Sequence, residues 1–573
     1  MHCDWLSRRF NTLPLLFRPV VAVAEPFPVR LQFSCAEDVE LWQFCVAVGG
    51  VEPIVEGNIV CDSGVPIVRS PISGGIPIGD HPVVPARPWR NIARDRRLKW
   101  TCVAGSIFLA LLAGCGAGEP AQQPGRGVLA SITITPLSGP VESGDVMQLS
   151  AVGTDVYGNR VSLPPLTWTS SDSGIAKVTA DGFLAALGPG SVSISAGSGQ
   201  IVGSLSLTIN AGITFSFGAE ETVFRWSSDR CEDLDLPDVP AHAVRLADGT
   251  LALMAADAPR NYTMFGADFS SLRRSCATPA LISGDNNYPD SYDNQEWIHS
   301  IYREGNVIHG LIANEYHDPF AANCSPGNTH PGNPCWYDSI TYTFSTDGGH
   351  NFTHATPPGH VIAPPWSKWD PQGNPAPYGY FFPSNILLAG DGFRYSLFIA
   401  SDRTGSGRMC VMRTQTLSDP ASWRAWDGTG FNLQMTSPYT GPAPAMCGAV
   451  APPPDLVPRP TLTYNTYLQK YMLIGGGLVG GPTDFLCGFF YSLSPDLINW
   501  TRLRLVRTAH VPWSPQCFPE GTIGATFPSF IDHDDGTINF ERPGRTPYLY
   551  YTRFNDHALD RDLVRVPVTI TAH

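Results

Sequence analysis

The sequence predicts an all-β protein, with a small β-sandwich followed by a five-bladed β-propeller. Three observations lead to this expectation. The 573 residues include 56 Gly and 53 Pro with 11% aromatic residues, a composition typical of short strands joined by many turns. A turn containing Ser, Asp and an aromatic residue recurs at intervals of roughly 75 residues, beginning at Ser345, Ser418 and Ser494. Strand–turn–strand patterns of about 55–85 residues also repeat through the C-terminal part.

The bulk properties narrow the class of protein. Hydrophobic residues make up 43% of the chain, enough for a packed core, and the length predicts more than one domain. Charged residues make up only 15%, and the net charge is −14. No basic stripe with interleaved aromatic residues is visible, so a nucleic-acid partner is not expected.

The N-terminal stretch resembles no domain and precedes an export signal. Residues 1–92 lack sustained periodicity, and we interpret them as lying outside the mature protein, with a flexible extension as the alternative. Residues 93–115 form the expected signal: a basic stretch at 94–100 precedes an apolar run at 101–113. This run is too short for a transmembrane helix.

The signal ends in Leu112-Ala113-Gly114-Cys115, which resembles the lipobox of bacterial lipoproteins. The resemblance implies that Cys115 is lipidated and anchors the chain to a membrane. Because Gly116 follows rather than Asp, it also implies the outer membrane or the surface of a bacterial cell envelope. A plain transmembrane anchor or a chance cysteine is the alternative. Residues 116–127 are rich in Gly, Pro and Gln and predict a flexible tether.

Residues 128–210 alternate polar and apolar residues with a period of two over several short runs, which predicts a compact β unit. The runs at 168–178 and 182–190 resemble the group 2 bacterial immunoglobulin-like domain (BIG2). The resemblance implies an immunoglobulin-like sandwich that acts as a spacer. No ionisable cluster in this segment suggests chemistry.

Residues 213–573 contain five strand-rich units, which predict the five-bladed propeller. Four units open on a Pro followed by small or polar residues, and one opens without a Pro; the openers begin at Pro240, Glu296, Pro383, Pro460 and Pro528. We expect the final strand at 563–570 to complete the first unit and close the ring, which removes an exposed sheet edge. A sandwich or a second sheet domain is the alternative.

This region holds eight cysteines, and the export signal places them in an oxidising compartment, where disulfides form. Pairing neighbours in sequence keeps each bridge within one unit or loop, so we favour 231–276, 324–335, 410–447 and 487–517. Zinc binding by these cysteines is disfavoured because no Cys-x2-Cys spacing occurs.

The candidate site follows from the propeller geometry, because the inner strands of all blades point one end at the central axis. The openers and the segments near them carry the candidates: Asp238, His242, Arg260, Glu296, His299, Glu315, Asn385 and Arg459. Aromatic residues stack on sugar rings, and Tyr380 and Phe382 lead directly into an opener. Each of these side chains also has a purely structural interpretation, such as capping a turn or ordering a loop.

The five units with their Ser/Asp/aromatic turns resemble glycoside hydrolase family 43, and the turn at 345–352 resembles the Asp-box of sialidases. The family resemblance implies glycosidic bond hydrolysis by two carboxyl groups, one donating a proton and one acting as base. Asp238 matches the first-blade acid as the base. The openers at Pro383 and Pro460 lack the expected acids, so Glu296 or Glu315 would supply the proton.

Two functions follow as expectations. The first is an exported, lipid-anchored enzyme that hydrolyses oligo- or polysaccharide as a monomer; the second is a non-catalytic propeller that binds glycans. A polysaccharide lyase is a third option. No metal or organic cofactor is expected in the catalytic site, although the acidic loops at 285–290 and 532–536 are candidates for structural Ca²⁺.

Overall fold

The computed structural model describes residues 127–573 except 138, 320–323, 325–328, 331–332, 374–375, 443–444, 451–458, 481–484 and 513–515. Residues 1–92, the expected signal at 93–115, Cys115 and the expected tether up to residue 126 therefore lie outside the described residues. Within the described part, regular structure is almost entirely β, which confirms the all-β prediction. No helix in that part has the length and apolar character needed to cross a membrane.

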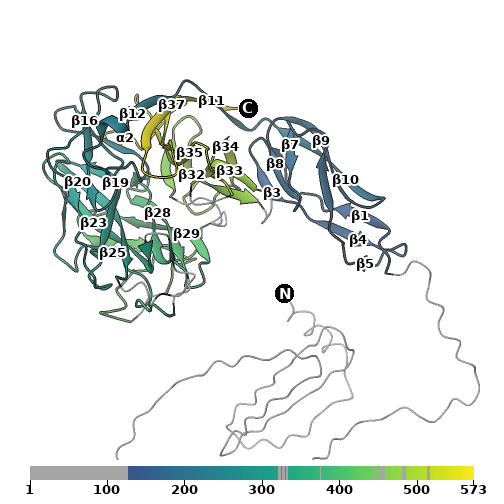
Figure 1. Cartoon of the computed structure of the whole chain (residues 1–573), viewed down its shortest axis with the longest axis horizontal. Coiled ribbons are helices and arrows are strands. Elements are labelled where there is room, and N and C mark those ends of the chain that lie inside the picture. The colour runs from purple at the N-terminus through teal and green to yellow at the C-terminus, as the bar shows by residue number, and fades with distance from the viewer. Residues whose placement is uncertain are drawn as a thin grey trace, which may run out of the picture. The chain divides into compact units, whose positions relative to one another are not determined.

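Three small sheets form between residues 131 and 210 (Figure 1). They contain β1 (Ser131–Ile134), β4 (Ala151–Thr154) and β5 (Arg160–Val161); β2 (Val141–Glu142), β10 (Ile201–Asn210), β9 (Gly190–Ser198) and β6 (Thr167–Ser170); and β3 (Val146–Gln148), β8 (Phe183–Ala186) and β7 (Ala176–Val178). The side chains of β1 alternate between exposed and buried, as the period of two predicts. Ile132, Leu184 and Ile194 meet in one apolar core.

The next sheet and a long composite sheet follow along the chain (Figure 1). The first contains β13 (His242–Arg245), β14 (Leu251–Met254), β16 (Thr263–Gly266) and β17 (Arg273–Arg274). The second follows the path β19 (Gln295–Glu304), β20 (Val307–His317), β23 (Trp336–Ser345), β26 (Tyr378–Phe381), β28 (Arg394–Ser401), β29 (Gly407–Thr414) and β30 (Arg424–Ala425), with β24 (Thr353–His354), β25 (Val361–Ala363) and β27 (Leu387–Leu388) attached. A parallel pairing of β23 with β26 joins two of the predicted units.

Two more sheets complete the region. One contains β31 (Thr461–Asn465), β32 (Lys470–Gly480), β33 (Phe485–Ser494) and β34 (Arg504–Thr508), and the other contains β35 (Gly524–Ile531), β36 (Tyr548–Phe554), β37 (Arg561–Ala572), β11 (Ile213–Phe217) and β12 (Glu221–Phe224). Two short pairs also form: β15 (Arg260–Asn261) with β18 (Leu281–Ile282), and β21 (Thr329–His330) with β22 (Asn333–Pro334). The described helices are α2 (Trp226–Asp229) and the 3-10 turn η2 (Pro420–Ser422).

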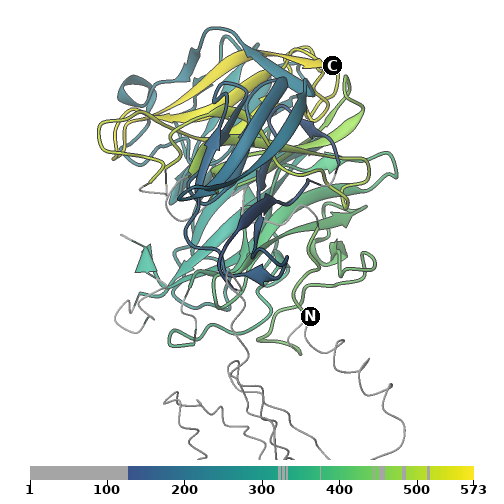
Figure 2. The ribbon, with the colours of Figure 1, turned by 90° about the vertical axis from the view of Figure 1, so that its right-hand side faces the viewer.

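The first and last strands of this region close it differently from the expectation. β37 pairs with β36 and with β11 and β12, so the last sheet takes its outer strands from residues 213–224 (Figure 2). The prediction that the final strand completes the first unit is wrong. Instead, β11 and β12, which precede the first unit in sequence, add to the sheet of the last unit. The edge of β37 is covered in either case.

Residues at four of the predicted openers, together with Ile301 just after the opener at Glu296, line one small cavity of about 10 Å³, enough for about one water molecule. His242 of β13, Ile301 of β19, Asn385 next to β27, Thr461 of β31 and Ser529 of β35 line it. Segments of β13, β19, β31 and β35 therefore meet around this cavity.

The four expected disulfides are confirmed. Cys231 pairs with Cys276, and the other three bridges join neighbours in the same way: Cys324–Cys335, Cys410–Cys447 and Cys487–Cys517.

The recurring turn owes its shape to its own polar side chains. The Ser494 hydroxyl accepts from the N–H of Leu497 at 2.8 Å, and Asp496 Oδ1 accepts from the N–H of Asn499 at 2.7 Å. The side chain of Trp500 is buried beneath the turn and donates to the Leu497 carbonyl at 3.0 Å. In the turn that begins at Ser345, the Ser and Asp side chains bond the backbone in the same manner. These turns stabilise hairpins and carry no chemistry.

Candidate functional site

Asp238 precedes β13 and is the most exposed carboxylate of the candidate site. Its side chain is 19% exposed, and Oδ1 forms an ion pair with Arg561 at the start of β37. Burial raises the pKa of Asp238, and the positive charges of Arg561 and Arg459 oppose that shift. The first and last sheets of the region thus meet at this ion pair.

Asp257 was missed by the sequence analysis, although it neighbours Asp238. It lies three residues beyond the end of β14, is buried, and accepts a hydrogen bond from Trp297 Nε1 at 2.8 Å. Burial raises the pKa of Asp257 well above its usual value, and the charge of Asp238 raises it further. The sequence could have indicated Asp257 by its position. It follows the second strand of its unit, and Glu315 lies near the end of the second strand of the next unit.

Glu315 and Asp338 face each other across β20 and β23 as directly opposed residues. Both are buried, and Glu315 Oε2 lies 3.4 Å from His317 Nε2. Burial raises the pKa of Asp338 well above its usual value, and the charge of Glu315 adds to the shift. Asp338 therefore favours its protonated, uncharged form. Asp338 was not predicted, because the sequence analysis considered the start of the first strand of each unit, and Asp338 lies near the start of a third strand.

Arg459 lies between two aromatic rings from neighbouring openers. Its guanidinium carbon is 4.3 Å from the ring centroid of Phe382 and 5.0 Å from that of Phe527, distances at which cation–π attraction operates. Each of these three residues directly precedes a proline and has a positive φ, between 50° and 58°. Residues before proline usually adopt extended conformations, so this backbone costs of order 1–3 kcal/mol per residue. The surrounding packing holds all three in this conformation.

Arg459 also links the carboxylates electrostatically. Burial lowers the pKa of its guanidinium, and the negative charges of Asp238, Glu315 and Asp338 oppose that shift. One cation therefore serves carboxylates from the first sheet and from the composite sheet. This cluster, Asp238, Asp257, Glu315, Asp338, Arg459 and Arg561, is called the carboxylate–arginine centre below.

Burial disfavours the charged form of the two predicted histidines next to this centre. Burial lowers the pKa of His242 to about 3. Burial also lowers the pKa of His299 well below its usual value, and the charge of Arg459 lowers it further. The His299 ring lies with its centroid 5.7 Å from that of Phe382.

Three other predicted substrate-binding residues have local partners. Arg260 forms an ion pair with Glu232 at 2.8 Å, and its side chain is 46% exposed. Asn385 accepts a hydrogen bond from the Leu462 N–H at 2.7 Å and also donates to the Leu462 carbonyl, so it joins two inner strands. Tyr380 is fully buried within the apolar core of the composite sheet.

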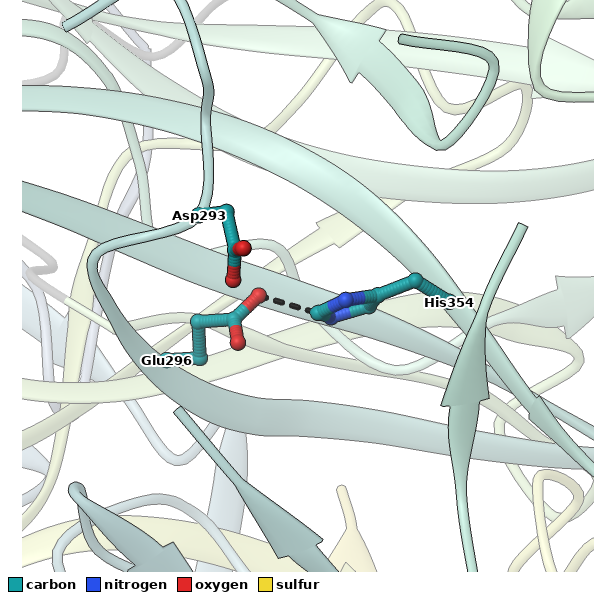
Figure 3. A group of neighbouring side chains, drawn as sticks. All are labelled: Asp293, Glu296 and His354. Atoms are coloured by element: carbon teal, nitrogen blue, oxygen red, sulfur yellow. Dashed lines mark ion pairs between the residues drawn. The ribbon is translucent and has the colours of Figure 1, made fainter. Parts of the chain in front are cut away.

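Glu296 lies in a different neighbourhood from Asp238. It is fully buried, and its Oε1 is 2.7 Å from His354 Nε2, with Asp293 alongside (Figure 3). Burial raises the pKa of Glu296, and the contact with His354 opposes that shift. The next residue, Trp297, instead reaches Asp257, because successive strand residues point to opposite faces.

The acidic loop at 532–536 uses its carboxylates on its own backbone. Asp532 accepts from the N–H groups of Asp534 and Gly544, and Asp535 accepts from those of Thr537 and Arg542. In the loop at 285–290, the side chain of Asn286 accepts from the N–H of Tyr288 at 3.1 Å. These bonds order both loops, and the expectation of structural Ca²⁺ there stays a prediction.

Comparisons with known proteins place the chain in no family. No protein family model matches it. A curated relative, ice-binding protein 1 of Shewanella frigidimarina, is 38% identical over 82 residues, which cover 14% of this chain and 9% of that protein. The chain thus spans about a tenth of the length of this relative.

Several solved structures are similar at low identity. A protein of unknown function from Dyadobacter fermentans has a TM-score of 0.37 at 11% identity, covering 62% of this chain and 99% of that one. An endo-arabinase from Bacteroides thetaiotaomicron has a TM-score of 0.32 at 11% identity, with 61% and 97% covered. The catalytic domain of a GH62 alpha-L-arabinofuranosidase from Coprinopsis cinerea has a TM-score of 0.36 at 10% identity, with 62% and 98% covered. Likeness at this level assigns neither a fold nor an activity, so the proposals below depend on this chain's own residues.

Proposed function

We propose that residues 213–573 form a five-bladed propeller that hydrolyses glycosidic bonds at the carboxylate–arginine centre. The observation that carries this proposal is the meeting of Asp238 with the Glu315–Asp338 pair around Arg459, from two separate sheets. Hydrolysis of a glycosidic bond needs one ionised and one protonated carboxyl group on either side of the bond. This centre offers both states.

Asp238 is assigned as the base. Burial raises the pKa of Asp238, but two guanidinium groups oppose that shift, and the side chain is partly exposed. An ionised carboxylate can accept a proton from the attacking water or stabilise the positive charge that develops on the sugar ring. Its ion pair with Arg561 fixes the orientation of the carboxylate.

The Glu315–Asp338 pair is assigned as the acid. Burial and the charge of Glu315 favour a proton on Asp338, and a protonated carboxyl group can donate to the leaving oxygen. Glu315 is 6% exposed, whereas Asp338 is 0% exposed, so Glu315 is the member that reaches the substrate. The acid role moves here from Glu296, whose carboxylate contacts His354 instead.

The remaining parts of the chain are assigned supporting roles. We propose that residues 128–210 form an immunoglobulin-like spacer of the BIG2 type, and that a lipid on Cys115 holds a monomeric protein at the outer membrane or surface of a bacterial cell. An oligo- or polysaccharide is the partner. Phe382 and Phe527 sandwich Arg459 and so hold the central cation in place.

The test is a screen of sugars released from a panel of plant and bacterial polysaccharides. We expect wild-type protein to release sugar from at least one, and Asp238→Asn and Glu315→Gln each to lower kcat by about 100-fold or more. Asp290→Asn is the matched control, because Asp290 is an exposed loop carboxylate. Release that survives both substitutions would overturn the assignment of base and acid.

A non-catalytic glycan-binding propeller remains the second candidate, and one observation favours it. The carboxylates of Asp257 and Asp338 are buried, and Asp238 is already paired with Arg561. Carboxylates that are buried or already paired with an arginine hold a binding surface rigid, and they are less free to exchange protons with a substrate. Glycan binding without sugar release by wild-type protein, measured on the same panel, would select this function over hydrolysis.

A further inference from the structure

Asp293, Glu296 and His354 gather on three different segments. Asp293 is in the loop before β19, Glu296 lies in β19, and His354 ends β24. One ligand atom from each lies within 4.8 Å of the others, and Figure 3 shows their polar ends converging. This group is called the Asp-Glu-His cluster below, and it includes no member of the carboxylate–arginine centre.

The polar atoms of this cluster lack ordinary hydrogen-bond partners. The Glu296 side chain is 0% exposed, and neither of its carboxylate oxygens has a hydrogen-bond partner within the described structure. His354 Nε2 lies 2.7 Å from Oε1 and forms an ion pair with it when the imidazole is protonated, although the contact does not have hydrogen-bond geometry. Buried Asp293 Oδ1 also lacks a partner. Burying a carboxylate without compensation is costly, so atoms arranged in this way call for a cation.

The protein supplies little positive charge to meet this need. Among the described residues, no lysine or arginine forms an ion pair with Asp293 or Glu296. The groups that face the cluster electrostatically are histidines: His354 itself, and His360 with its ring centroid 5.3 Å from that of His354. His360 Nε2 donates to the Tyr292 carbonyl at 3.0 Å, and its buried Nδ1 has no hydrogen-bond partner among the described residues.

The backbone around the cluster is built to hold it. Glu296 is fixed on both sides, because its N–H donates to Ser283 Oγ at 3.0 Å and its carbonyl accepts from Asn261 Nδ2 at 2.8 Å. Gly284 leaves room for Asp293, since a Cβ at residue 284 would lie 1.8 Å from Asp293 Oδ1. The three donors therefore occupy a preformed space.

We propose that Asp293, Glu296 and His354 bind a divalent transition-metal ion, with Zn²⁺ as the best match. One imidazole nitrogen and two carboxylates are among the ligands that Zn²⁺ takes in proteins, at about 2.0–2.2 Å from the metal. Ca²⁺ is disfavoured, because it takes six to eight oxygen ligands. The ion joins the loop, β19 and β24.

The test is direct metal binding by the full chain. The protein is freed of metal with a chelator, and the six cysteines outside the four disulfides are alkylated so that thiols cannot capture zinc. Calorimetric titration with Zn²⁺ should show one ion per chain, and Tm should rise with added Zn²⁺. Titrations with Mn²⁺ and Ca²⁺ complete the series, with Ca²⁺ binding more weakly than Zn²⁺.

Variants separate this site from adventitious binding. Glu296→Gln and His354→Ala should each weaken Zn²⁺ binding by at least about tenfold, whereas Asp290→Asn should not change it. Asp293→Asn tests the same site at a less buried side chain if Glu296→Gln fails to fold. Co²⁺ in place of Zn²⁺ gives a visible spectrum that His354→Ala should alter. Absence of stoichiometric binding, equal binding by all variants, or tighter binding of Ca²⁺ than of Zn²⁺ would overturn the proposal.

Discussion

The carboxylate–arginine centre and the Asp-Glu-His cluster both bury acidic side chains, but they balance the charge in different ways. In the first, Arg459 and Arg561 provide permanent positive charge to Asp238 and its neighbours. In the second, the contacts within the described residues offer Glu296 only an imidazole. The two groups share one region of the chain, since Trp297 and Glu296 are consecutive residues that point to opposite faces of β19.

The difference separates two uses of a buried acid. A guanidinium stays charged at any relevant pH, so it can hold a carboxylate ready for chemistry without an added ion. An imidazole nitrogen is a metal ligand as well as a base, and an imidazole beside two carboxylates forms a set of donors that an external cation can bind. Carboxylates beside guanidinium groups therefore favour a substrate site, and carboxylates beside an imidazole favour a metal site.

The largest expected effect comes from removing the central cation. Arg459→Met should lower the free energy of unfolding by about 3 kcal/mol, the low end for a broken buried ion pair, because Arg459 is only partly buried. Urea denaturation measures the change, and sugar release should be lost with it. Arg459→Lys is the control that keeps the charge. A loss below about 1 kcal/mol for Arg459→Met would show that the carboxylates do not depend on this guanidinium.

A smaller effect, dependent on pH, should follow from Asp338→Asn. The raised pKa of Asp338 means that the folded state keeps its proton when the unfolded state has released it, so wild-type stability falls as pH rises above about 4. The Asn side chain is neutral throughout and escapes this loss. The variant should gain stability relative to wild type by up to about 1.4 kcal/mol per pH unit.

Denaturation curves between pH 4 and pH 8 measure this difference. The exposed carboxylate of Asp290 provides the comparison, and Asp290→Asn should show no such slope. A flat difference between wild type and Asp338→Asn would mean that Asp338 is ionised in the folded protein, and the proton would then have no place on the Glu315–Asp338 pair.

The sequence located part of the carboxylate–arginine centre because strand starts mark the inner end of each unit. Asp238, Phe382 and Arg459 were found in this way, and they lie near one another as expected. The disulfide pairing was also predictable, because neighbours in sequence close short loops within a unit. A repeat pattern therefore predicts the first strand of each unit and the disulfides that form within a unit.

The sequence did not predict which residues of the second and third strands of each unit belong to the carboxylate–arginine centre. Asp257 follows a second strand and Asp338 begins a third, and their positions depend on how the sheets meet. Glu296 illustrates the limit of register: a step of one residue along β19 separates the Asp257 neighbourhood from the His354 neighbourhood. The three residues of the Asp-Glu-His cluster have no common motif, so only the folded chain brings them together.

A modest effect on the second site should come from a single added methyl group. Gly284→Ala should weaken Zn²⁺ binding by about tenfold, equal to about 1.4 kcal/mol, because the new Cβ displaces the Asp293 carboxylate. The unfolding free energy of the metal-free protein should change little, since Asp293 can rotate away. Unchanged Zn²⁺ affinity in calorimetric titration would remove Asp293 from the ligand set while leaving the carboxylate–arginine centre unaffected.

The smallest effect is expected at Arg260, whose charge belongs to neither group. Its guanidinium pairs with Glu232 at 2.8 Å on a side chain that is 46% exposed, and exposed ion pairs contribute about 0–1 kcal/mol. Arg260→Gln should therefore leave both unfolding and sugar release close to wild type, in contrast to Arg459→Met. A large loss of sugar release with normal folding would instead mean that Arg260 leaves Glu232 to bind substrate, and the arginines of the site would then number three rather than two.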